Sequence, residues 1–66
     1  MILKKYTDFC SVLDDSYNVI ADIKRTFGGM WKCEYNGYAF IHHTPELVFK
    51  QLKEFRLLTD NVIKEN

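Results

Sequence analysis

The last third of the chain carries apolar residues at steps of three and four, as on one side of an α-helix. This stripe comprises Val48, Leu52, Phe55, Leu58 and Val62, and is widened by Leu47, Leu57 and Ile63. Thr44 is a favourable N-cap, Pro45 suits the first helical position, and Glu46 complements the helix dipole. The pattern therefore predicts a long helix from about residue 45 to residue 64.

Residues 30–43 alternate around Asn36-Gly37, a pair typical of a type I′ β-hairpin because both central residues need positive φ. A two-residue loop pairs Tyr35 with Tyr38, Cys33 with Phe40, and Trp31 with His42. Alternation places Trp31, Cys33, Tyr35, Tyr38, Phe40 and His42 on one face, and Met30, Lys32, Glu34, Ala39, Ile41 and His43 on the other. We favour an arrangement in which helices cover the first, aromatic face. In the alternative, those rings are exposed as a stacking platform for bases.

Residues 16–27 predict a helix of about three turns, with Tyr17, Ile20, Ile23 and Phe27 on one side. Asp15 or Ser16 is its expected cap, and Gly28 its left-handed stop. Residues 9–13 read as a strand, with Phe9, Ser11 and Leu13 on one face and Cys10 and Val12 on the other. A helix starting at Thr7 fits the same residues, and we favour the strand.

These elements predict one α+β domain over residues 1–66. The expected order is βαββα, a three-stranded antiparallel sheet with two helices packed on one face. A chain of 66 residues buries only about 60% of its unfolded surface. Its apolar content of 47%, including 15% aromatic residues, is nevertheless enough for a core. A homodimer that covers the remaining apolar surface is a further expectation.

The formal net charge of zero argues against a strongly basic polyanion binder and against an acidic mimic of DNA. Residues 24–56 are mildly basic, whereas residues 1–23 are mildly acidic. The candidate contacts for a nucleic acid or a protein partner are Lys24, Arg25, Lys32, Tyr35, Tyr38, Lys50, Lys53 and Arg56.

No catalytic, cofactor or metal site is predicted. The soft ligands are Cys10, Cys33, His42 and His43, without a Cys-x-x-Cys pair and with the two histidines on opposite strand faces. No spacing suggests a nucleophile with its base and oxyanion hole, so we do not expect an enzyme. No segment approaches the ~20 apolar residues of a membrane span, and residues 1–9 lack a signal-peptide run. We therefore predict a cytoplasmic protein, or a nuclear one in a eukaryotic host, with reduced cysteines and no membrane partner.

Several residues resemble the pattern of the HARP (HepA-related protein) domain of annealing helicases and of similar small modules in phages, viruses and plasmids. The matching residues are Phe9, Val12, Tyr17, Ile20, Ile23, Lys24, Gly28, Gly29, Trp31, Gly37, Tyr38, Phe40, Glu46 and Leu52. The chain departs from the pattern at His42-His43 and carries no fused helicase. The resemblance implies binding to DNA or to a DNA-processing enzyme.

Two functions are therefore expected. The first is a non-enzymatic, nucleic-acid-associated module that binds DNA or a DNA-processing enzyme. The alternative is a phage- or virus-encoded interaction factor that docks on a host protein and inhibits or retargets it. Neutral charge and abundant Tyr and Phe favour the alternative, because aromatic residues dominate protein interfaces.

Overall fold

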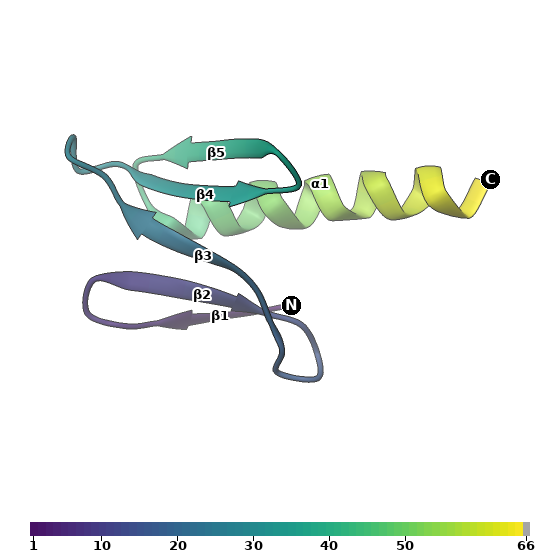
Figure 1. The fold of residues 1–66 in the computed structure, drawn as a ribbon, viewed down its shortest axis with the longest axis horizontal. Helices are drawn as coiled ribbons and strands as arrows, with labels where there is room; N and C mark the ends of the chain where they lie inside the picture. The colour runs from purple at the N-terminus through teal and green to yellow at the C-terminus, as the bar shows by residue number, and fades with distance from the viewer. Residues whose placement is uncertain (66) are drawn as a thin grey trace.

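Over residues 1–65, five strands follow one another and pair in that order as an antiparallel meander, with one helix after them (Figure 1). The computed structural model describes residues 1–65, and the side chains of residues 1–59. The elements are β1 (Ile2–Lys5), β2 (Phe9–Leu13), β3 (Val19–Arg25), β4 (Trp31–Tyr35), β5 (Tyr38–His42) and α1 (Pro45–Glu65). Helix α1 runs along one face of the sheet, against β3, β4 and β5.

The predicted three-stranded sheet with two helices is wrong, although the fold remains α+β. Residues 19–25 form β3, not a helix, and residues 2–5 add β1. The two ends of the supposed helical stripe, Tyr17 and Phe27, are exposed. Ala21 and Ile23 alternate with Asp22 and Lys24, and this period of two lets β3 pair with both β2 and β4.

Residues 9–13 are the predicted strand, and the helix alternative from Thr7 is wrong. Strand β2 lies between β1 and β3, and its residues on both faces are buried from Cys10 to Leu13. The backbone N–H and C=O groups of these buried residues need hydrogen-bond partners along both edges of β2, so β2 cannot be an edge strand. The register between β2 and β3 shifts at Val12/Leu13, where a bulge interrupts the pairing.

The β4–β5 hairpin and α1 confirm the predictions based on local signals. Asn36 and Gly37 have φ of 52° and 80°, and the Tyr35–Tyr38 and Cys33–Phe40 pairs form as expected. The Thr44 hydroxyl accepts a hydrogen bond from the Leu47 N–H at 3.3 Å, as an N-cap should. The predicted apolar positions Val62 and Ile63 lie outside the residues whose side chains are described.

The core lies between α1 and the aromatic face of the hairpin. Cys10, Ile23, Cys33 and Phe40 are direct neighbours in one row across β2 to β5, and all are buried. Val48 and Leu52 of α1 are fully buried in the same cluster. The Phe55 ring lies 5.5 Å from that of Phe40. The helix therefore covers the predicted face and excludes the stacking platform there, although Tyr38 stays exposed at the margin.

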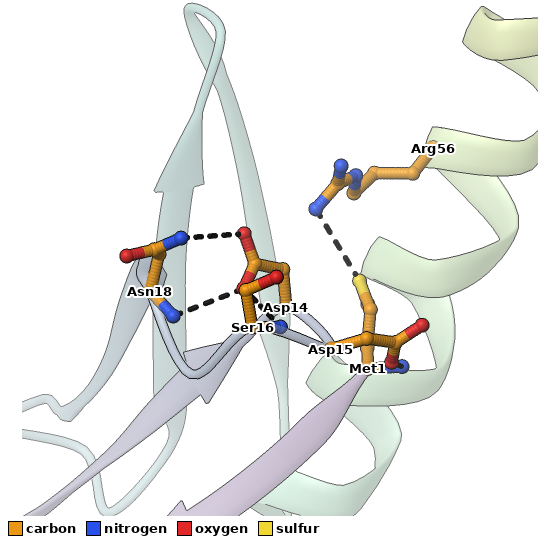
Figure 2. Close-up of polar contacts among 6 residues, drawn as sticks. All are labelled: Met1, Asp14, Asp15, Ser16, Asn18 and Arg56. Carbon is orange, nitrogen blue, oxygen red and sulfur yellow. Dashed lines mark hydrogen bonds and ion pairs between the residues drawn. The ribbon is translucent and has the colours of Figure 1, made fainter.

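Two turns lie where caps were expected for the helix predicted over residues 16–27. The Asp14 carboxylate accepts hydrogen bonds from the N–H groups of Ser16 and Asn18, at 2.8 and 2.9 Å, and so closes the β2–β3 loop (Figure 2). Between β3 and β4 the left-handed residue is Gly29, with φ of 76°, and not Gly28 as predicted. Short polar residues that commonly start helices here build tight turns between strands.

Acid should weaken the protein partly through Asp14. The Asn18 and Ser16 N–H groups lower the pKa of this carboxyl below its usual value near about 3.9. A lowered pKa stabilises the fold above the unfolded-state value, and the contribution disappears as the pH falls through the folded-state value. We expect Asp14→Asn to lose less stability than the native protein between neutral pH and about pH 2, as measured by urea unfolding.

The matched control is Asp8→Asn, in the β1–β2 turn, where the described side chains provide no hydrogen bond to the carboxylate. Its acid response should follow that of the native protein. Equal responses of Asp14→Asn and the native protein would contradict the role given to Asp14.

Candidate nucleic-acid interface

The predicted contact residues do not form one surface. Alternation along β3 and β4 places Lys24 and Lys32 on the open face of the sheet, away from α1. Arg25, Tyr35 and Tyr38 belong to the face that α1 covers, and Lys50, Lys53 and Arg56 lie on α1 itself. The structure therefore brings Lys24 and Lys32 together and separates them from the other candidates.

Most candidates on the helix side take part in packing. The Arg56 guanidinium lies 5.9 Å from the centre of the Tyr35 ring, and its Nη1 donates to Met1 Sδ at 3.5 Å (Figure 2). Arg25 lies 5.9 Å from the Trp31 ring, whose indole is half-buried against the core. The geometry gives these cations intramolecular partners.

Two further candidates on α1 differ in their surroundings. Lys53 extends over the Phe49 ring, with its Nζ 5.4 Å from the ring centre. Lys50 is exposed and lies about one turn of α1 before Lys53. Tyr38 is exposed, but its ring lies 4.9 Å from that of Phe55.

On the open face, one row of side chains crosses β2 to β5. The pairings are Phe9 with Lys24, Lys24 with Lys32, and Lys32 with Ile41. We call Phe9, Lys24, Lys32 and Ile41 the open-face row. Directly opposed residues have Cβ atoms about 4.5–5.5 Å apart, so two like charges here are unfavourable without a counter-charge. The row therefore places two neighbouring lysines between two exposed apolar side chains.

Two carboxylates lie in the next row, and one of them pairs with a lysine of the open-face row. Asp22 accepts a hydrogen bond from the Ser11 hydroxyl at 2.8 Å, and Glu34 pairs with Lys32 at 3.1 Å. Among the described side chains, Lys24 has no carboxylate within ion-pairing distance. A shallow depression of about 340 Å³ lies over this part of β3 and β4, lined by Asp22, Lys24, Thr26, Lys32 and Glu34.

Aromatic rings that the sequence analysis did not assign to a site lie at the same end of the sheet. Tyr6 and Phe9 stack at 4.7 Å with an interplanar angle of 16°, and Lys4 Nζ is 5.4 Å from the Tyr6 ring. Phe27 is fully exposed in the β3–β4 loop. Figure 1 shows this loop and the β1–β2 turn at the same end. The sequence signal for Phe9 was its place on the strand face that does not carry Cys10 and Val12. Phe27 was not identified as a surface residue because residues 16–27 were predicted to form a helix.

The soft side chains Cys10, Cys33, His42 and His43 have separate surroundings. Cys10 and Cys33 are buried and form no disulfide, and burial raises the pKa of each thiol. His42 Nε2 hydrogen-bonds to the Gln51 side chain, while His43 is exposed after β5. Within the side chains that the structure describes, no three His, Cys, Asp or Glu residues converge as metal ligands.

Comparisons with protein-family models, with curated proteins and with solved structures give no match. Over residues 1–65, no helix has both the length and the apolar character needed to cross a membrane.

Proposed function

We propose that the protein is a non-enzymatic, nucleic-acid-binding module that takes single-stranded DNA or RNA on the open face of its sheet. The observation that carries the proposal is the direct pairing of Lys24 with Lys32, beside the exposed ring of Phe9. Single-strand binders combine cations that follow the backbone with aromatic rings that stack on bases. The resemblance to the HARP domain relied on a helix near residues 17–24, so it adds no support here.

The geometry also suggests how a single nucleic-acid strand would lie on the sheet. The open-face row runs across the strands, from Phe9 to Ile41, with Tyr6 stacked on Phe9 at one end. A base stacked on this aromatic pair leaves its phosphates over Lys24 and Lys32. Because the sheet is open and shallow at this face, the arrangement favours a flexible single strand over the groove of a rigid duplex.

The double variant Lys24→Gln/Lys32→Gln tests the proposal against Lys50→Gln/Lys53→Gln, which removes the same charge from α1. We expect the first variant to bind labelled oligo-dT at least ~10-fold more weakly at low salt. The slope of log affinity against log salt should fall by ~1.4, about 0.7 for each lost phosphate contact with a single strand. Fluorescence anisotropy on oligo-dT, the matching RNA and a duplex provides the measurement.

The control variant should bind like the native protein. Equal losses in both variants would place the contact elsewhere or show a generic charge effect. Absence of binding by the native protein at tens of micromolar and low salt, on all three probes, would overturn the proposal. The protein-docking alternative would then become the leading hypothesis.

A further inference from the structure

The open meander leaves two edge strands, β1 and β5, and only one of them is protected (Figure 1). Strand β1 carries Lys4 and Lys5, and charged residues are a usual means of preventing strands from adding to an edge. Strand β5 reads Tyr-Ala-Phe-Ile-His, without Lys, Asp, Glu or Pro. Such an edge is a template for pairing with another strand.

The turn geometry determines which groups β5 offers. In the β-turn over residues 35–38, the Tyr38 N–H pairs with the Tyr35 carbonyl, as a two-residue hairpin loop requires. Hydrogen-bonded and non-bonded pairs alternate along an antiparallel ladder, so Phe40 and His42 also bond to β4. Ala39 and Ile41 therefore direct their N–H and C=O groups to the free edge, and both residues are exposed.

We propose that a second copy of this chain pairs with the β5 edge, antiparallel and centred on Phe40, to make a symmetric dimer with a continuous sheet of both copies. In this register Ala39 lies opposite Ile41 of the second copy, and Tyr38 lies opposite its His42. Each Ala39–Ile41 pair exchanges two hydrogen bonds, so the symmetric pairing satisfies all four outward N–H groups. The proposal is independent of nucleic-acid binding.

The edge suits its own copy because it is self-complementary. The uncharged strand places no like charges opposite each other, and the small Ala39 lies across from the larger Ile41. A standard interface buries about 800 Å² per partner, more than a five-residue strand supplies. Apolar side chains on both sides of the edge extend it: Ile41 is 49% exposed on the open face, while Tyr38 is 58% and Leu47 45% exposed on the helix side.

Light scattering after gel filtration, without nucleic acid, tests the dimer. The native protein should have twice the 7.9 kDa mass of one chain at tens of micromolar. Ala39→Pro removes an outward N–H that makes no bond to β4, which edge strands tolerate, and should yield a folded monomer by circular dichroism. Ala39→Thr keeps the N–H and should remain dimeric.

Ala39→Lys is a second disrupting variant, because a lysine here protects the edge and faces Glu34 across the hairpin. It keeps the test decisive if the proline variant fails to fold. A native mass of one chain up to about millimolar concentration would overturn the proposal, as would a folded lysine variant that dimerises as well as the native protein.

A cysteine pair tests the register. Opposed residues of a hydrogen-bonded pair have Cα atoms about 5.5 Å apart, within the range of a disulfide. Ala39→Cys/Ile41→Cys should therefore form covalent dimers on mild oxidation, whereas Ala39→Cys alone should not. The native Cys10 and Cys33 are buried and should not interfere. Equal cross-linking of the single and double variants would contradict pairing centred on Phe40.

Discussion

Leu52→Ala is expected to leave the protein largely unfolded in water, whereas Leu57→Ala should leave it folded. Leu52 of α1 is fully buried and belongs to the same core cluster as Ile23 and Phe40 of the sheet. A buried Leu→Ala change usually costs about 2–5 kcal/mol. A core of this size rarely supplies more than about 3–5 kcal/mol, so the loss is comparable to the whole stability.

Leu57 provides a matched control because it undergoes the same substitution on the same helix but is 63% exposed. Its removal should change stability by no more than about 0.5 kcal/mol, as for most surface positions. Circular dichroism with urea titration compares the two variants. Similar midpoints for Leu52→Ala and Leu57→Ala would show that α1 does not pack on the sheet through Leu52.

The two cysteines should react with thiol reagents about two to three orders of magnitude more slowly in the folded protein than in the unfolded chain. Cys10 and Cys33 retain only 2% and 1% of their accessible surface, and burial raises the pKa of both thiols. A thiolate is the reactive species, so a buried thiol with a raised pKa reacts mainly when the chain opens. The rate should then follow the small unfolded fraction of a marginally stable domain.

Labelling with a chromogenic disulfide reagent, with and without urea, measures this protection. Asp8→Cys is an internal standard, because its exposed thiol in the β1–β2 turn should react rapidly in the folded protein while the native pair stays protected. Rapid labelling of Cys33 in the native protein would contradict its place beneath α1.

Local sequence signals predicted the β4–β5 hairpin and α1 well. Asn36-Gly37 needs only the positive φ values of its own turn, and Thr44-Pro45 needs only its own helix start. Each signal acts over a few residues, so no distant part of the chain is needed to interpret it. The alternation in residues 9–13 likewise identified β2 and placed Cys10 and Val12 on one face of it.

The sequence alone misplaced residues 19–25, because the spacing of Ile20 and Ile23 fits a helical step, whereas the alternation of Ala21 and Ile23 fits a strand. Their conformation depends on β2 and β4, which offer ladder partners on both sides of β3. The pairing energy comes from contacts with neighbouring strands and not from residues 19–25 themselves. The periodicity of this segment therefore does not reveal it. The same reason explains why β1, a four-residue strand paired only with β2, was not predicted.

The sequence by itself determined the types of residue available for binding: scattered lysines and arginines, and many aromatic residues. Only the tertiary structure decided which of them meet. Lys24 and Lys32 are neighbours because β3 pairs with β4, and Phe9 joins them because β3 also pairs with β2. Arg56 is drawn away to Tyr35 and Met1 because α1 packs on the opposite face. Side-chain chemistry is encoded locally, whereas adjacency across a sheet depends on long-range strand register.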